Sequence, residues 1–171
     1  MKLTKEQKEH LENIYQTFLH DEKILKMKEI PMHRGSNCYL HSFKVAKVAI
    51  RRAVHRNNVD LEVVLIASIL HDYYLYDWRS DRSKRKGHSK NHPLIAAEQA
   101  ERDFGVPESV KKIIRSHMWP LNIKEYPNTI EAKIVSLADK HIASIEGSIP
   151  KAFKKKYEKE SYEHISHLFD K

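Results

Sequence analysis

The sequence predicts an all-α fold, a single-domain helical bundle over residues 1–171. Apolar residues recur at spacings of three and four through most of the chain, as they do on the buried stripe of a helix. The alternation of apolar and polar residues that is typical of strands is almost absent. Glycine and proline number only 4 and 6, and they fall between the apolar patterns. A chain of 171 residues is long enough for one domain with a sizeable core.

The composition argues against disorder, secretion and membrane insertion. Hydrophobic residues make up 40% of the chain and charged residues 32%, a balance typical of a packed domain. Residues 1–6 are charged and lack the apolar core of a signal peptide, and no apolar run approaches the length of a membrane span. Cys38 is the only cysteine, so an internal disulfide and a thiolate-only metal site are excluded. We therefore expect a cytoplasmic protein with no membrane partner, whose metal ligands would be imidazoles and carboxylates.

The net charge of +8 bears on the partner of the protein. It arises from 31 Lys and Arg against 23 Asp and Glu, and it favours a polyanionic or phosphorylated partner. A basic surface that serves only solubility explains the charge equally well. Nucleic acid is not the expected partner, because the sequence contains no nucleic-acid recognition motif.

Two amphipathic helices are expected in the N-terminal third of the chain. Residues 4–19 carry apolar side chains on one face, a pattern that indicates packing. Ser36 follows a stretch with proline and glycine, and we expect it to cap a second helix that runs to about Val54. His41 lies on the apolar stripe of this second helix and is predicted to point at the core.

The most hydrophobic segment, residues 61–70, is apolar almost all the way round and predicts a helix at the centre of the domain. It delivers the adjacent pair His71 and Asp72 at its end. Residues 79–90 are strongly basic, too polar to pack and interrupted by Gly87, which predicts a mobile loop. Such a loop could cover a site at Asp72.

Four further helices are expected in the C-terminal half. The first begins at about His92, with Pro93 in its first turn, and ends near Gly105, which can take the left-handed cap. The other three are bounded by proline, threonine or glycine, and the last of them is basic. They are expected over residues 107–118, over residues 129–147 with Thr129 as the N-cap, and over residues 151–171.

Six histidine and aspartate side chains carry the candidate chemistry. They are predicted to point at the core or its rim: His41, His71, Asp72, His92, His117 and Asp139. Singly, such a histidine is typical of a hydrogen-bonded core residue, and the end of an apolar helix could simply meet solvent. Asp72 fits that description poorly, because the helix dipole disfavours it and an unpaired buried carboxylate is costly. One shared centre explains all six residues, since oxygen and imidazole ligands suit a divalent Zn, Mn, Fe, Co or Ni ion.

The order of these residues resembles the HD-domain superfamily of metal-dependent phosphohydrolases, over about residues 32–146. Its most telling pieces are Leu70-His71-Asp72, the run His92-Pro93-Leu94-Ile95-Ala96-Ala97-Glu98, and Ala138-Asp139-Lys140. The additional pair His92 and His117 is similar to that of members that bind two metals.

The resemblance implies two metal positions that share Asp72 as a bridging and catalytic residue. The first would be completed by His41, His71 and Asp139, and the second by His92 and His117. A single ion is the alternative, and His88 competes with His92 as a ligand. Fe or Mn is favoured over Zn, Co and Ni.

The chain departs from a common form of the family pattern in two places. Tyr73-Tyr74 follow the HD pair where many members have an Ile-Gly-Lys run, and Met118 stands where many have a second histidine. The usual lysine near the metal is therefore missing. Arg79, Lys140 or the loop residues 82–86 could replace its charge, and of these we expect Arg79 and Lys140 to bind the phosphoryl oxygens of the substrate.

By this resemblance the chain is a metal-dependent phosphohydrolase that acts on a nucleotide or a related small phosphorylated metabolite, and a homodimer is compatible with that activity. One alternative is a di-iron oxygenase of the same superfamily that acts on a small diol or phosphonate. Another is a non-catalytic module that binds a polyanion through its positive charge and the run Lys154-Lys155-Lys156.

Overall fold

The computed structural model describes residues 3–32, 36–79 and 85–169. Within these ranges the regular structure is helical, apart from one isolated bridge between Pro31 and Asn37. The predicted all-α fold is therefore confirmed. Within the part of the chain that the structure describes, no helix is both long and apolar enough to cross a membrane.

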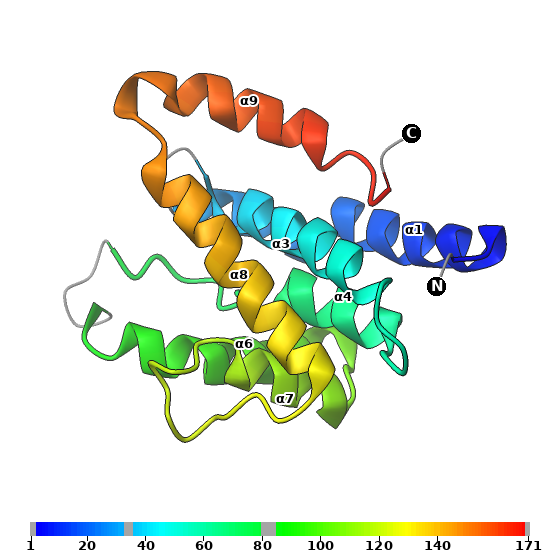
Figure 1. The fold of residues 1–171 in the computed structure, drawn as a ribbon. Helices are drawn as coiled ribbons and strands as arrows, with labels where there is room; N and C mark the ends of the chain where they lie inside the picture. The colour runs from blue at the N-terminus through cyan, green and yellow to red at the C-terminus, as the bar shows by residue number, and fades with distance from the viewer. Residues whose placement is uncertain (1–2, 33–35, 80–84, 170–171) are drawn as a thin grey trace.

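The helices are drawn in chain order in Figure 1. They are α1 (Lys5–His20), α2 (Glu22–Leu25), the 3-10 helix η1 (Lys26–Glu29), α3 (Cys38–Ala53), α4 (Leu61–Leu70), α6 (His88–Phe104), α7 (Glu108–Ser116), α8 (Ile130–Ser148), the 3-10 helix η2 (Lys151–Phe153) and α9 (Lys154–His164).

Helices α3 and α4 form the centre of the molecule. α3 packs against α4, α8 and α9, and α4 also contacts α7 and α8. α4 is buried along most of its length because it is apolar on nearly every side, as its sequence predicts. Helices α6 and α7 lie side by side, and α8 crosses between this pair and α9 (Figure 1). The C-terminal ends of α4 and α7 are thereby placed near α8, inside the core.

Side-chain caps explain where several helices begin. Thr4 and Gln7 form a reciprocal capping box at the start of α1, and Thr129 accepts the N–H of Ala132 as predicted. The prediction of Ser36 as a cap is wrong, because Asn37 accepts the N–H of Leu40 and α3 begins one residue later. The reason is tertiary. The N–H of Cys38 bonds to the carbonyl of Ile30 at 2.9 Å and holds the preceding backbone extended.

Helix α6 begins at His88, so the predicted start at His92 is wrong. Gly87 precedes the helix with a positive φ of 85°, a conformation that glycine adopts at little cost, and its carbonyl accepts the N–H groups of Lys90 and Asn91. Pro93 consequently lies inside the helix instead of in its first turn. The basic segment that the sequence predicts to be mobile falls partly outside the described residues, at 80–84, and its last three residues are helical.

The C-terminal segment is shorter than predicted as a helix, because α9 ends at His164. The chain then turns onto α1, where its backbone finds partners that a continuing helix would not offer. The hydroxyl of Tyr15 donates to the carbonyl of Ile165 at 2.8 Å, and Glu12 accepts the N–H of Leu168 at 3.1 Å. The start of the chain and its end therefore support each other.

Candidate metal centre

The structure brings all six sequence-predicted candidate ligands together within the core. α3 contributes His41, the end of α4 contributes His71 and Asp72, α6 contributes His92, the end of α7 contributes His117, and α8 contributes Asp139. Each of these residues is at most 8% exposed. Buried polar groups of this kind require partners, so the arrangement of their donor atoms decides what the site can do.

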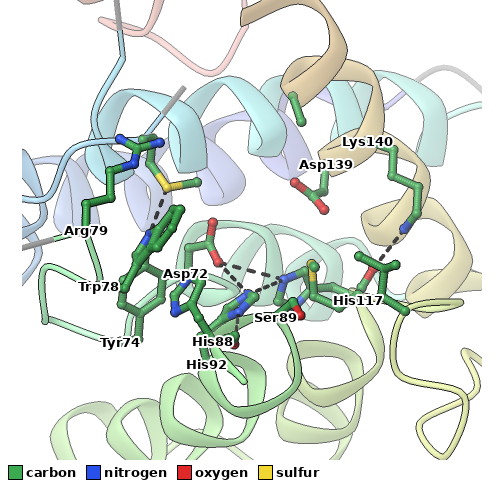
Figure 2. A pocket seen from close by; sticks show the side chains of 14 residues that line it. Asp72, Tyr74, Trp78, Arg79, His88, Ser89, His92, His117, Asp139 and Lys140 are labelled. Atoms are coloured by element: carbon green, nitrogen blue, oxygen red, sulfur yellow. Dashed lines mark hydrogen bonds and ion pairs between the residues drawn. The ribbon is translucent and has the colours of Figure 1, made fainter. Parts of the chain in front are cut away.

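The two oxygens of Asp72 face different sets of side chains. Oδ2 lies 3.3 Å from Nε2 of His71 and 4.0 Å from Nε2 of His41. Oδ1 lies 3.2 Å from Nε2 of His92 and 3.7 Å from Nε2 of His117. One carboxylate thus joins two groups of imidazoles, and the second group is visible around it in Figure 2.

Asp139 belongs to the first group. Its Oδ1 lies 3.0 Å from Nε2 of His41 and 3.7 Å from Nε2 of His71, and in Figure 2 it projects from α8 toward the cluster. The donor atoms therefore gather around two neighbouring points, one beside each oxygen of Asp72.

The local structure sets the orientation of three histidine rings. Nδ1 of His71 lies 2.8 Å from the carbonyl of Ser68, and Nδ1 of His117 lies 2.7 Å from that of Ile114. Nδ1 of His92 lies 2.8 Å from the carbonyl of His88. A carbonyl only accepts, so each Nδ1 carries a proton and each Nε2 is the nitrogen directed at the cluster.

The donor set fits a divalent cation. Nε2 of His71 is buried beside the carboxylates of Asp72 and Asp139, at 3.3 and 3.7 Å, and Nε2 of His92 lies only 3.1 Å from Nε2 of His117. When the latter two rings are neutral, two lone pairs meet at this distance unless a cation lies beside them. Donors that each lie about 2.1 Å from one ion are at most about 4.2 Å apart, and the four distances from the oxygens of Asp72 to the imidazole nitrogens meet that limit.

Electrostatics leave both carboxylates ionised. Burial raises the pKa of Asp72, but the charges and hydrogen bonds of His71 and His92 outweigh burial and hold it well below its usual range. Burial likewise raises the pKa of Asp139, and hydrogen bonds to His41 and His71 hold it well below its usual range. Each carboxylate is therefore available as an anionic ligand, and a bound cation would take the place of the imidazole protons that now face it.

The histidines divide into two kinds. Burial lowers the pKa of His117 to about 3, with His71 and His92 adding to the effect, so this ring is neutral near pH 7. Burial also lowers the pKa of His41, but Asp139 and Glu146 outweigh burial and raise it to about 9. Protons thus take positions beside the carboxylates that a metal would occupy, which is the usual competition at metal sites.

The comparison with known families agrees with this geometry. The family model of the HD domain matches residues 38–144. This chain belongs to the HD domain family. The match spans more than half of the chain and contains all six candidate ligands, so the resemblance seen in the sequence is confirmed. Members are typically metal-dependent hydrolases, and the buried His and Asp groups could hold a divalent metal. The search of curated proteins and the search of solved structures returned no match.

A pocket of about 280 Å³ opens on Asp72 in this HD domain. Its walls are mostly aromatic and aliphatic, and Figure 2 shows how they surround the cluster. The side chains other than the candidate ligands are Met32, Tyr74, Trp78, Arg79, His88, Ser89, Met118, Leu121, Lys140 and Ala143. The cluster is therefore accessible from one side to a small molecule.

The two predicted substrate-binding cations both line this pocket. The guanidinium of Arg79 lies over the ring of Trp78 at 4.8 Å from its centroid. The ammonium of Lys140 donates to the carbonyl of His117 at 2.9 Å and to the hydroxyl of Ser136 at 2.6 Å. Lys140 thus holds the backbone of the candidate ligand His117 in place through this hydrogen bond. Its contact with substrate, like that of Arg79, stays a prediction.

His88 does not join the candidate ligands in the described part of the chain. Its ring stacks between Trp78 and His92, with centroid distances of 4.6 and 4.5 Å, and its Nδ1 lies 2.9 Å from the hydroxyl of Tyr76. Burial lowers the pKa of His88 to about 4. It forms part of the wall that supports His92.

Sequence reasoning missed two residues next to the site, Glu146 and Lys44. Nδ1 of His41 lies 2.8 Å from Oε2 of Glu146, and the other oxygen of Glu146 forms an ion pair with Lys44. Burial raises the pKa of Glu146, but His41 and Lys44 outweigh it and lower the value to about 2. The signal was spacing, because Glu146 follows Asp139 by seven residues and so lies two helical turns along the same face of α8.

Proposed function

We propose that this HD domain hydrolyses a phosphoester of a small phosphorylated metabolite, foremost a nucleotide, with a divalent metal at the cluster. One observation carries the proposal. At the floor of an accessible pocket, Asp72 presents one oxygen to His71 and the other to His92, at 3.3 and 3.2 Å. A carboxylate shared in this way could hold two adjacent divalent ions, and such ions would bind the phosphoryl oxygens of a substrate.

The residues divide into two holding groups around Asp72. His41, His71 and Asp139 would hold a metal beside Oδ2, and His92 and His117 would hold one beside Oδ1. When bound, the metal supplies Lewis acidity and lowers the pKa of a water ligand toward neutrality. Asp72 would orient the attacking water toward phosphorus. Fe or Mn remains the favoured ion in this proposal.

The pocket supports a small anionic substrate with an apolar part. Its volume of about 280 Å³ is near the lower end for small-molecule sites. Tyr74 and Trp78 offer aromatic surface to a nucleobase or a similar group, and Arg79 lies at hand for phosphoryl oxygens. The net charge of +8 attracts a phosphorylated molecule over longer distances.

The first test measures the metal content of the purified protein and the release of phosphate from a panel of nucleotides and small phosphomonoesters, with Mn²⁺ or Fe²⁺ added. Asp72→Asn should lower the rate by at least roughly 100-fold, because it removes both the bridging charge and the group that orients water. Glu98→Gln makes the same chemical change at an exposed position of α6 and should leave the rate unchanged.

Two outcomes would contradict the proposal. Tightly held iron without release of phosphate from any substrate would favour the oxygenase alternative. Binding of a polyanion that survives Asp72→Asn but weakens on substitution of Lys154, Lys155 and Lys156 would favour the non-catalytic alternative.

A further inference from the structure

A row of buried charged side chains, Glu146 and Lys44, connects His41 of the candidate metal centre to the C-terminal helix α9. The carboxylate of Glu146 is fully buried between Nδ1 of His41 and the ammonium of Lys44, which is itself only 5% exposed. The ammonium lies 3.4 Å from the hydroxyls of Tyr157 and Ser161 on α9, and 4.6 Å from the centroid of the Tyr157 ring. Helix α9 therefore covers Lys44, the last side chain of this row.

We propose that Glu146 and Lys44 are positioning residues for His41 and that α9 holds them in place. This rests on the proposed function in one respect, that His41 is a metal ligand. The rings of His71, His92 and His117 are oriented by carbonyls three or four residues away in the sequence. For His41 the residue opposite Nδ1 is a carboxylate 105 positions along the chain.

The chemistry of this contact favours metal binding. A carboxylate accepts the Nδ1–H of the imidazole, fixes the ring and makes Nε2 the nitrogen that faces the cluster, where Asp139 lies 3.0 Å away. A buried carboxylate is costly by itself, and Lys44 offsets its charge. Lys44 is three residues from His41 on α3, so both side chains lie on the face that meets α8.

Two of these parts lie outside the region that the family model matches. The match ends at residue 144, before Glu146 and before α9. Lys44 lies within the match on α3, so the support of His41 joins a matched segment to residues that follow the match. A purely structural ion pair is the competing explanation, and it predicts that the pair can be replaced by apolar residues without effect on the site.

The decisive variant is the double substitution Glu146→Leu with Lys44→Met, which removes both buried charges together. We expect it to fold, as judged by circular dichroism and thermal unfolding, and to bind Co²⁺ roughly 10- to 100-fold more weakly in competition with a chelator. ¹⁵N-edited NMR of the metal-free protein should show that the protected Nδ1–H proton of His41 is lost. Unchanged Co²⁺ affinity together with a retained Nδ1–H proton would overturn the proposal.

Single variants keep the test decisive if the double variant unfolds. Glu146→Gln keeps the shape of the side chain but removes its charge, and it should weaken Co²⁺ binding roughly 10-fold. Equal affinity would overturn the proposal. On α9, Tyr157→Leu removes contacts to Lys44 and should weaken binding, whereas Tyr162→Leu is the matched control, because Tyr162 bonds to Asn37 instead.

Failure of the proposed function is recognised separately. A wild-type protein that binds no Co²⁺ would contradict the proposed function. The Nδ1–H proton of His41 can still be followed in the metal-free protein. Its presence in the wild type and absence in the double variant would support the positioning role, and its presence in both would overturn it.

Discussion

His92 and His88 show how a small difference in position separates a candidate ligand from its support. They lie one turn apart on α6, and their rings stack at 4.5 Å. Nε2 of His92 reaches Oδ1 of Asp72 at 3.2 Å, whereas His88 packs on Trp78. The geometry at the residue scale therefore favours His92 for the second metal position.

Replacing each of these histidines separately tests this assignment. His92→Ala should lower the bound divalent metal by about one ion per chain. The second metal position would then keep only His117 and one oxygen of Asp72, and two ligands bind a divalent ion more weakly than three. His88→Ala should leave the metal content unchanged. Elemental analysis after dialysis measures both, and equal loss in the two variants would contradict the assignment.

At the scale of the elements, helix ends place the metal-binding candidates. α4 ends at Leu70 and α7 at Ser116, and a histidine follows each directly. The last carbonyls of a helix have no partner within it, so they can accept the ring N–H of such a histidine. His71 and His117 both use a carbonyl three residues earlier. The end of a helix thus orients a candidate ligand without help from distant residues.

The contact between α1 and the C-terminal segment depends on the charge of Glu12. Its carboxylate accepts the N–H groups of Leu168 and Phe169 at 3.1 and 3.3 Å. Burial raises the pKa of Glu12, but these bonds and the one from Gln16 outweigh burial and lower it below its usual value of 4.5. Because the folded protein holds the charged form more strongly, the stabilisation is present above pH 4.5 and is lost as the pH falls through the lowered pKa.

Glu12→Gln should therefore destabilise the protein at pH 7 by about 1 kcal/mol, a small value because solvent screens this partly exposed group. The difference in melting temperature from the wild type should shrink as the pH is lowered below 4.5. Glu9→Gln on the same helix is the control, since Glu9 is exposed and pairs only loosely with Lys5 at 3.6 Å. A pH-independent difference for Glu12→Gln would contradict the prediction. Thermal unfolding followed by circular dichroism across this pH range measures it.

At the scale of the whole molecule, five helices enclose the six candidate ligands, with α3 and α4 at the centre. Two carboxylates and four imidazoles are buried together there, an arrangement that is costly without a counter-ion. A bound cation would therefore connect the helices that carry these ligands, in addition to its role in catalysis. Metal binding and the stability of the fold should consequently be linked.

Removing the metal should lower the melting temperature. A ligand at 100 times its dissociation constant stabilises the folded state by about 2.7 kcal/mol, which corresponds to roughly 5–10 °C for a chain of this size. Scanning calorimetry with added Mn²⁺ and after treatment with a chelator measures the shift. Asp72→Asn should abolish most of it, and a shift of the same size in that variant would show that Mn²⁺ binds elsewhere.

Local patterns in the sequence were sufficient to predict most helices. The apolar periodicity of α4 and the cap Thr129 act within a few residues, so no tertiary information was needed. The errors fall where distant contacts decide. Asn37 replaces Ser36 as a cap because Ile30 holds the adjoining backbone extended. The last helix stops early because Glu12 and Tyr15 bind the backbone that follows it.

The sequence by itself determined the residue types of the site and the inward direction of their helix faces, because both follow from periodicity along one chain. Only the tertiary structure decided how they combine. That Asp72 turns one oxygen toward His71 and the other toward His92 depends on how α4, α6 and α8 pack. The support of His41 by Glu146 and Lys44 likewise exists only where α3, α8 and α9 meet, since a buried charge is stable only beside partners that the fold brings to it.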